Sequence, residues 1–466
     1  MSIKIGLEIH CRLDTKSKLF CSCASDSTNK HPNQETCPIC LGFPGYKPRV
    51  NKKAIEHVIR IGIGLDCNIS EKTYFSRKTY FYPDMSKNFQ ITQYEVPIAI
   101  DGKIKLGEDD IHIKRVHLEE DPARIVYANG NILTTKYILV DYNRAGAPLA
   151  EIVTEPDIKS PQQARMLLEK ISMILEYLGV YDSSKEASIR VDANISSNGS
   201  ERVEIKNITG FENVEKALSY ESVRQSNMLR INKQIERETR HFDESTKTTS
   251  AMRSKEFEED YGYIFDPDLP LINIDEIWLN SIKSTLPELP DMRSKRIATA
   301  YGLNEYEANV LVYTDKQFVD FFERCVAKYN KPKEISKWMI NYLLKSLNWR
   351  SERIANSKVS IDGFLEFLNL IESGTITERY AKELIKTYVD TGESPKKLIS
   401  ATPLNNEPLE EIIKKVVLDN MQAYEEFKAG KAQALQYLIG KVLKANANRS
   451  DPQKIVSILN SMVQNK

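Results

Sequence analysis

The sequence lacks a net charge, a long apolar run and an amino-terminal targeting segment. Its 65 basic and 65 acidic side chains cancel, so any contact with nucleic acid must come from local patches and not from a global positive field. No apolar run approaches the roughly 20 residues of a membrane-spanning helix. Residues 1–4 lead directly into a predicted strand, without the features of a signal peptide. We therefore expect a cytoplasmic protein with no membrane partner.

Familiar nucleotide-binding and disulfide signatures are also missing. The chain contains no Walker-type glycine loop, and no G-x-G-x-x-G motif follows a strand. If ATP binds, it binds in a mode that these patterns do not identify. Seven cysteines in 466 residues do not indicate a disulfide framework in this compartment. The length itself predicts roughly two to four domains.

The most informative segment that is present is a predicted strand at the amino terminus, Lys4–Leu13. Its apolar residues alternate with a second set that includes Glu8, His10 and Arg12, and alternating side chains of a strand point to opposite faces. A carboxylate and an imidazole two residues apart can bind a divalent cation or transfer protons. The alternative interpretation is an ordinary solvated sheet face.

Four of the cysteines form two close pairs, Cys21 with Cys23 and Cys37 with Cys40, separated by a short polar loop. Four thiolates satisfy a closed, tetrahedral zinc site with no position left for a substrate. We therefore predict a structural zinc, the alternative being four free thiols. Cys11, Cys67 and Cys325 are interpreted as small buried hydrophobic residues.

The first half of the chain predicts a mixed sheet. Strand-like alternation recurs at residues 111–118, 136–142, 188–195 and 202–208, and Pro161–Leu178 has helical spacing. Short strands interrupted by single helices favour an α+β fold. Charged residues collect on these predicted strands and at their ends: Arg190, Asp192 and Asn194; Glu204 and Lys206; Glu119, Glu120 and Asp121; and Glu151.

Residues 77–84, with the sequence R-K-T-Y-F-Y-P-D, place Arg77 and Lys78 beside aromatic rings. This composition suits a nucleotide or a tRNA end through charge and stacking. A packed turn is the alternative interpretation.

From about Asp291 the pattern becomes helical, with apolar residues at helical spacing in 308–322, 335–347, 364–371 and 380–389. Residues 402–408 form a turn-rich linker. Between Phe427 and Ser450 the chain has no acid but five cations: Lys428, Lys431, Lys441, Lys444 and Arg449. A solvated helix face is one interpretation of this stretch, and a phosphate-binding patch is the other.

Several motifs, in order, carry a family resemblance. They are I-G-L-E-I-H (5–10), C-P-I-C-L-G-F-P-G (37–45), R-K-T-Y-F-Y-P-D (77–84), H-L-E-E-D (117–121), V-D-Y-N-R-A-G-A-P-L-A-E-I-V (140–153), R-V-D-A-N-I-S (190–196), V-E-I-K-N (203–207) and F-K-A-G-K-A-Q-A-L (427–435). The chain resembles, over essentially its whole length, the B subunit of the glutamyl/aspartyl-tRNA amidotransferases.

This resemblance implies a catalytic cradle domain over 1–290 with a zinc-binding loop, an all-α helical domain over 291–402 and a small helical, tRNA-binding tail domain over 403–466. It also implies ATP-dependent amidation of Glu mischarged on tRNA(Gln), of Asp on tRNA(Asn), or of both. The side-chain carboxylate is phosphorylated and then attacked by ammonia, which a glutaminase A subunit supplies in a heterotrimer with a small C subunit. Nothing in this chain resembles a glutaminase nucleophile arrangement.

The chemistry of that reaction agrees with the residues. Bringing a carboxylate to a triphosphate requires a divalent ion and cations. We predict catalytic roles for Glu8, His10, Glu119, Glu120, Glu151 and Asp192. Magnesium ligands are predicted at Glu8, His10, Glu120 and Glu151, with Glu119 as an alternative or additional ligand to Glu120. ATP contacts are predicted at Arg77, Lys78, Arg190 and Lys206. A non-catalytic tRNA-binding scaffold is the alternative function.

Overall fold

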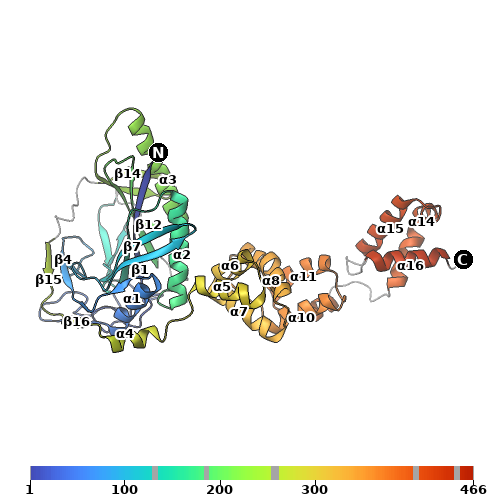
Figure 1. The fold of residues 1–466 in the computed structure, drawn as a ribbon, viewed down its shortest axis with the longest axis horizontal. Coiled ribbons are helices and arrows are strands. Elements are labelled where there is room, and N and C mark those ends of the chain that lie inside the picture. The colour runs from blue at the N-terminus through green and yellow to red at the C-terminus, as the bar shows by residue number, and fades with distance from the viewer. Residues whose placement is uncertain are drawn as a thin grey trace. The chain divides into compact units, whose positions relative to one another are not determined.

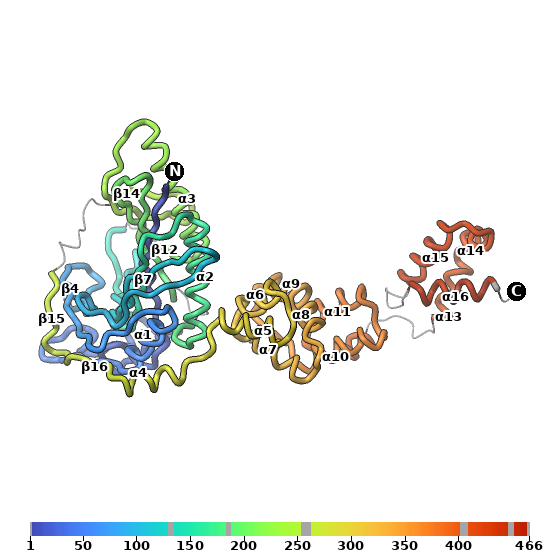
Figure 2. Tube along the Cα trace, in the orientation of Figure 1, coloured from blue at the N-terminus to red at the C-terminus, as the bar shows by residue number. Residues whose placement is uncertain are grey.

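The computed structural model describes residues 2–128, 135–182, 188–252, 262–401, 409–445 and 452–464. The chain divides into two compact units, Met1–Pro290 and Asp291–Lys466, which Figures 1 and 2 trace from blue to red. The first unit combines sheets with helices and the second is helical, so the predicted α+β class is confirmed. A separate tail domain stays a prediction, and the predicted linker at 402–408 lies outside the described residues.

A nine-stranded sheet forms the centre of the first unit. Its order is β14 (Thr248–Ala251), β13 (Glu238–Asp243), β12 (Val203–Thr209), β11 (Ile189–Ser197), β1 (Ile3–Arg12), β10 (Pro148–Thr154), β7 (Asp109–Glu120), β6 (Ala99–Leu106) and β2 (Asn68–Ile69). Neighbouring strands are antiparallel except β12 and β13, which are parallel. The sheet is therefore mixed, as the sequence predicts.

Three small sheets accompany it. The first joins β15 (Gly262–Phe265), β4 (Ser76–Thr79) and β5 (Phe89–Thr92), and the others pair β16 (Ile272–Asn273) with β3 (Lys72–Thr73) and β8 (Arg124–Tyr127) with β9 (Ile138–Asp141). The segment of the predicted zinc loop, residues 13–50, has no helix or strand of regular length among the described residues.

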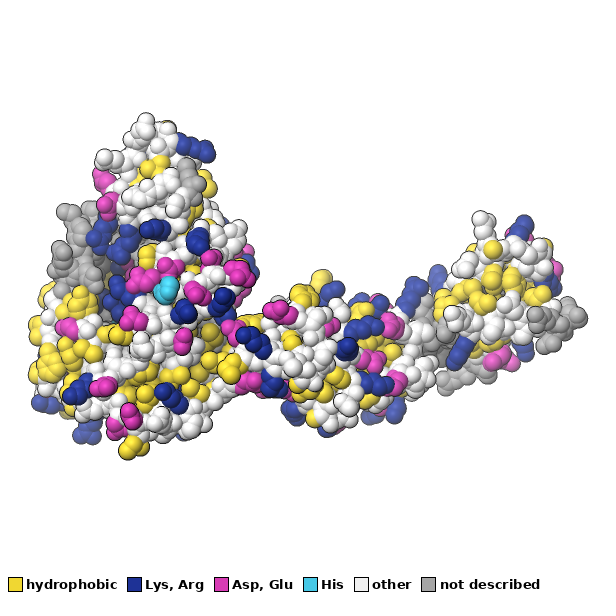
Figure 3. Space-filling view, viewed as in Figure 1, with side chains coloured by type: hydrophobic (Ala, Val, Ile, Leu, Met, Phe, Trp, Pro, Cys, Tyr) yellow, Lys and Arg dark blue, Asp and Glu magenta, His cyan; other side chains and the backbone are white. Residues whose placement is uncertain are grey.

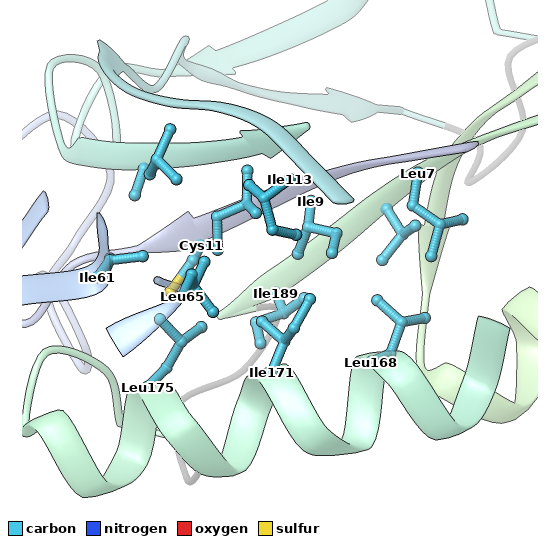
Figure 4. Close-up of a cluster of buried hydrophobic side chains, with 14 of the residues drawn as sticks. Leu7, Ile9, Cys11, Ile61, Leu65, Ile113, Leu168, Ile171, Leu175 and Ile189 are labelled. Atoms are coloured by element: carbon cyan, nitrogen blue, oxygen red, sulfur yellow. The ribbon is translucent and has the colours of Figure 1, made fainter. Parts of the chain in front are cut away.

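Strand β1 lies inside the large sheet, between β11 and β10. Its side chains alternate between a dry face of the sheet and a wetter one. Ile5, Ile9 and Cys11 are completely buried, whereas Glu8 and His10 are partly exposed. The dry face packs against helices α1 (Lys52–Gly64), α2 (Pro161–Leu178) and α3 (Phe211–Arg230), and Figure 4 shows side chains of β1 directed toward α2. The alternation predicted for this strand is confirmed.

Helix α2 begins and ends where its sequence indicates. The Ser160 side chain accepts a hydrogen bond from the Gln163 N–H, and Pro161 occupies the first turn, where its missing N–H has no cost. Gly179 ends the helix with φ at 66°, a left-handed conformation that glycine adopts without strain. The apolar stripe of α2 covers the sheet and leaves the opposite sheet face to functional side chains.

The first unit ends with α4 (Glu276–Lys283), and the remaining elements are helical. They are α5 (Pro290–Tyr301), α6 (Glu305–Thr314), α7 (Lys316–Lys328), α8 (Pro332–Trp338), a π-helical turn (Met339–Leu343), α9 (Leu344–Trp349), a 3₁₀ turn (Ile354–Asn356), α10 (Ile361–Glu372), α11 (Glu378–Thr391), α12 (Pro395–Ala401), α13 (Leu409–Asp419), α14 (Met421–Lys428), α15 (Ala432–Ala445) and α16 (Pro452–Gln464).

One predicted helical stretch, 308–322, is divided between α6 and α7. Asp315 is the cause, because it is extended (φ −167°, ψ 163°) and its side chain accepts a hydrogen bond from the Phe318 N–H to begin α7. The spacing of apolar residues alone does not predict such an N-cap. Helices α13 to α16 bury their own apolar cluster, which includes Ile413, Leu438 and Val442.

Among the described residues, no helix combines the length and apolar character required to cross a membrane. Charges of both signs are mixed over the surface seen in Figure 3, in keeping with the balanced composition, and hydrophobic side chains gather near the β4–β15 edge of the first unit.

Candidate active site and metal centres

The register of the central strands brings the predicted acids and histidine to one face of the large sheet. His10 on β1 lies opposite Glu151 on β10, and Glu8 lies opposite Asp192 on β11. Glu151 in turn lies opposite His117 on β7. Directly opposed residues of antiparallel strands share a face, so four strands contribute to one surface, which lies across the sheet from α2.

The first cluster consists of His10, Glu119 and Glu151, whose possible ligand atoms lie within 4.8 Å of one another. His10 Nδ1 is 3.2 Å from Glu119 Oε1, and His117 Nε2 is 3.2 Å from Glu151 Oε2. An imidazole and two carboxylates can hold a divalent cation, with His117 orienting one of the carboxylates.

The cluster strongly shifts the pKa values of His10 and Glu151. Burial alone would lower the pKa of His10, but the hydrogen bond with Glu119 and the charge of Glu151 outweigh burial and raise it to about 10. Burial alone would raise the pKa of Glu151, but the positive charge and hydrogen bond of His117 outweigh burial and lower it. A cation bound here therefore has to displace the His10 proton.

A second cluster consists of Glu8, Asp192 and Glu204, again with ligand atoms within 4.8 Å of one another. Glu8 Oε1 accepts a hydrogen bond from Asn194 Nδ2 at 3.1 Å, and Asp192 Oδ1 accepts one from the Asn207 N–H at 2.6 Å. Burial and the neighbouring carboxylates raise the pKa of Glu8 to about 7. Like charges at this spacing are relieved by a proton or by a cation.

Glu120, predicted as a magnesium ligand, is not brought into either cluster. Alternation along β7 directs it away from the face that carries Glu119. Its carboxylate accepts a hydrogen bond from Lys87 Nζ at 2.6 Å and another from the Ile91 N–H at 2.9 Å. Through these two hydrogen bonds, Glu120 holds β5 and Lys87 against the end of β7.

The two clusters line a pocket of about 600 Å³. Three of the four predicted ATP contacts, Lys78, Arg190 and Lys206, also line it. Arg190 is held by a 2.7 Å contact between its Nη2 and Asp121 Oδ1. The cations around the pocket are Lys4, Lys78, Lys114, Arg115, Arg190, Arg202, Lys206 and Arg237. Such a lining suits a polyanion.

Arg77 is outside the residues that line this pocket. Its guanidinium contacts Asp266 Oδ2 and Asp268 Oδ2, each at 3.0 Å, and lies 4.7 Å from the centroid of the Phe89 ring. Burial alone would lower the pKa of Arg77, but the hydrogen bonds and charges of the two aspartates outweigh burial and raise it. Through these ion pairs, Arg77 links β4 to the segment that follows β15.

Sequence reasoning missed several residues of the site. Glu204 completes the second cluster and His117 supports the first, yet neither is among the predicted site residues. A signal existed for both, because Glu204 shares a predicted strand face with Lys206 and His117 opens the H-L-E-E-D motif. For Lys4, Arg202 and Arg237 the sequence offers no distinguishing pattern.

The four predicted zinc ligands do come together. The Sγ atoms of Cys21, Cys23, Cys37 and Cys40 lie within 4.8 Å of one another, and those of Cys37 and Cys40 are 3.8 Å apart. A tetrahedron with zinc–sulfur bonds of about 2.3 Å has edges of about 3.8 Å. A hydrogen bond with Cys21 lowers the pKa of the Cys40 thiol to about 5. This donor set fits a structural zinc ion.

Comparison with known families shows to which family the chain belongs. The GatB/GatE catalytic domain family matches residues 3–280, which contain both acid clusters and the cysteine loop, and the GatB domain family matches residues 320–463. The chain belongs to the family of B subunits of tRNA-dependent amidotransferases. It is 45% identical over 475 residues to the B subunit of the aspartyl/glutamyl-tRNA(Asn/Gln) amidotransferase from Methanospirillum hungatei, covering 99% of this chain and 98% of that one.

Other members of the B-subunit family match at similar levels. The chain is 44% identical to the B subunit from Saccharolobus solfataricus, with 98% of each chain covered. It is 40% identical to that from Carboxydothermus hydrogenoformans, with 98% of this chain and 97% of the relative covered. The match therefore includes both compact units.

Proposed function

We propose that this chain is the amidating subunit of a tRNA-dependent amidotransferase. It would act in the cytoplasm as an ATP-dependent ligase that converts Glu on tRNA(Gln), Asp on tRNA(Asn), or both, to the corresponding amide. The observation that carries the proposal is the pair of acid clusters, on one sheet face, inside a pocket lined by cations. Its polyanionic substrate would be ATP, and its second substrate the carboxylate of the mischarged residue.

The two clusters would hold divalent cations, His10, Glu119 and Glu151 at one position and Glu8, Asp192 and Glu204 at the other. Bound cations would neutralise the repulsion between the triphosphate and the substrate carboxylate. His117, 3.2 Å from Glu151, would keep that carboxylate in its ligating orientation. This assignment separates Glu8 from His10 and uses Glu119 in place of Glu120.

The cations of the pocket would hold the nucleotide and the charge that develops during phosphoryl transfer. Arg190 is held in place by Asp121, whose Oδ1 lies 2.7 Å from Arg190 Nη2. Lys78 and Lys206 line the same pocket and would contact phosphates. The phosphorylated carboxylate reacts readily with water, so its amidation needs ammonia that arrives inside the pocket.

We infer that a glutaminase A subunit supplies this ammonia and that a C subunit completes the heterotrimer. Exposed hydrophobic side chains of the first unit, including Phe81, Ile264 and Phe265, suit contact with such a partner. The cysteine loop would hold structural zinc beside the catalytic face. These partners and the metals are part of the proposal.

The test is amidation by the chain co-purified with its partners, with Glu-tRNA(Gln) and Asp-tRNA(Asn) as separate substrates and ammonium chloride replacing glutamine. We expect release of the ATP γ-phosphate to depend on mischarged tRNA. His10→Ala and Glu151→Ala should abolish both phosphate release and amidation, yet retain partner assembly and tRNA binding. Normal phosphate release in both variants would instead favour a non-catalytic tRNA-binding scaffold.

A further inference from the structure

Lys18 is a completely buried lysine, and none of its hydrogen-bond partners within the described parts of the chain is a carboxylate. Its side chain is 0% exposed. Its Nζ donates to the Glu35 carbonyl at 2.7 Å, to the Tyr142 carbonyl at 3.3 Å and to Cys40 Sγ at 3.7 Å. Removing an ammonium group from water is costly unless an opposite charge lies close by. The carbonyls supply dipoles only, so the sulfur is the partner that can carry a full charge.

The cysteine cluster supplies such a charge when it binds zinc. Four thiolates around one Zn²⁺ carry a net charge of about −2, and in a buried loop this charge also needs a counter-charge. The Cys37 N–H contributes a hydrogen bond to Cys40 Sγ at 3.1 Å, but an amide contributes only a partial charge. The Lys18 ammonium brings a full positive charge into contact with that same sulfur.

We propose that Lys18 is the internal counter-charge of the zinc tetrathiolate and a positioning residue for its ligand Cys40. This inference rests on the proposal that the four cysteines hold zinc. Lys18 would raise zinc affinity because its ammonium, 3.7 Å from Cys40 Sγ, offsets the negative charge of the zinc tetrathiolate. It would also join the loop to the neighbouring turn, through the Tyr142 carbonyl.

The local packing leaves the Lys18 side chain little freedom. Gly146, at φ +83°, follows Tyr142 in the same turn, and a Cβ there would lie 3.6 Å from Lys18 Cδ and 3.7 Å from Cys40 Cβ. The Leu19 N–H donates to the Gly146 carbonyl at 2.8 Å. The turn therefore encloses the lysine stem, and its ammonium is held at the cluster by backbone on both sides.

The experiment compares variants in the assembled full-length protein. Lys18→Met keeps the stem and removes the charge, Lys18→Gln keeps a donor without the charge, and Lys18→Arg keeps the charge. Lys30→Met is the matched control, because Lys30 lies in the same loop but is half-exposed and pairs with Glu35 at 3.7 Å. Zinc content and competition with a chelator are measured for each variant.

We expect Lys18→Met and Lys18→Gln to bind zinc about 10- to 100-fold more weakly, the range found for residues that support metal ligands. Lys18→Arg should recover part of this loss, and Lys30→Met should lie within about twofold of the parent. In the cobalt-substituted protein, the sulfur-to-metal absorption band should shift in Lys18→Met, because Cys40 no longer receives a hydrogen bond from an ammonium, and should not shift in Lys30→Met.

Two outcomes would overturn the inference, and they are distinguishable. A parent protein that contains no zinc refutes the zinc site and the role of Lys18 together. A zinc-containing parent whose Lys18→Met and Lys18→Gln variants bind zinc as tightly, with an unshifted cobalt band, refutes Lys18 alone. Replacing a merely tolerated buried charge by an apolar side chain would leave zinc binding unchanged or improve it. If Lys18→Met does not fold, the Lys18→Gln measurements decide.

Discussion

At the scale of single residues, two adjacent glutamates of β7 have different environments. Glu119 belongs to the first cluster and contacts His10. Glu120 is buried and accepts hydrogen bonds from Lys87 and from the Ile91 N–H. We expect Glu119→Gln to lower amidation by about 100-fold or more, as the loss of a ligand predicts. We expect Glu120→Gln to cost about 3–5 kcal/mol of unfolding free energy, because it leaves a mostly buried ammonium unpaired.

The measurements are metal affinity from manganese binding and unfolding free energy from urea denaturation. Glu119→Gln should weaken manganese binding and change stability little, and Glu120→Gln should do the reverse. Each variant is the control for the other, since both replace a buried carboxylate by an amide at neighbouring positions. If Glu120→Gln alone failed to bind manganese, the assignment of the ligand would have to return to Glu120.

The raised pKa of Glu8 predicts a dependence of stability on pH. The pKa rises from 4.5 to about 7 through burial and neighbouring carboxylates, so the folded protein binds this proton more tightly than the unfolded chain. Its stabilising contribution is complete below pH 4.5 and is lost as the pH rises through 7. Without magnesium, Glu8→Gln should therefore unfold at a higher temperature than the parent at pH 8 but at a similar temperature at pH 4.5.

Thermal unfolding in magnesium-free buffer checks this prediction, and magnesium provides the control. Added magnesium should stabilise the parent at pH 8 more than it stabilises Glu8→Gln, because the variant lacks one anionic ligand. An equal difference in unfolding temperature at both pH values would show that Glu8 carries no buried charge.

Residue identity and alternation predicted the first cluster only in part. The sequence placed Glu8 and His10 on one face, but it left open which of Glu119 and Glu120 joins them, because strand register and bounds decide that question. Arg77 was assigned to ATP, but its partners Asp266 and Asp268 lie 189 and 191 residues away in the chain. A contact between residues so far apart in the chain leaves no pattern in the local sequence from which it could be predicted.

At the scale of elements, periodicity predicted the strands and helices with strong apolar patterns. The predicted helix Pro161–Leu178 has these bounds in the structure, and the predicted strand Lys4–Leu13 differs from β1 by one residue at each end. The division of 308–322 at Asp315 was not predicted. Its cause is a local hydrogen bond that leaves the apolar spacing intact on both sides.

Asp315 provides a test of that division. Its carboxylate accepts from the Phe318 N–H at 2.6 Å, and the residue is 4% exposed. Asp315→Ala should destabilise the helical unit by about 1–2 kcal/mol, the cost of losing an N-cap. Glu305→Ala, at an exposed position in the first turn of α6, is the control and should change little. Urea denaturation followed by circular dichroism provides the measurement, and equal effects of the two substitutions would contradict the cap.

At the scale of the whole molecule, the charges balance, so the proposed tRNA binding has to depend on local patches. In the tail, Lys428 Nζ lies 2.7 Å from Glu425 Oε1, and Lys431 Nζ lies 3.5 Å from Glu426 Oε2. These carboxylates offset part of the positive charge that the sequence suggested for this region. Lys441 and Lys444 are exposed on α15. Within the predicted basic stretch 427–450, we expect these two cations to meet phosphates, and Arg449 lies outside the described residues.

The last prediction separates tRNA docking from chemistry. Ending the chain after residue 404 removes α13 to α16, which bury a core of their own, so the first unit should keep its fold. tRNA affinity should then fall, with a salt slope lower by roughly 0.7–0.9 for each phosphate that the shortened chain no longer neutralises, while amidation at saturating tRNA remains near the parent rate. Lys441→Ala combined with Lys444→Ala should reproduce part of the slope change without removing any helix, and Lys428→Ala, whose charge is paired, should change it less. If truncation abolished amidation at unchanged tRNA affinity, the tail would serve the chemical step and the division of labour would be wrong.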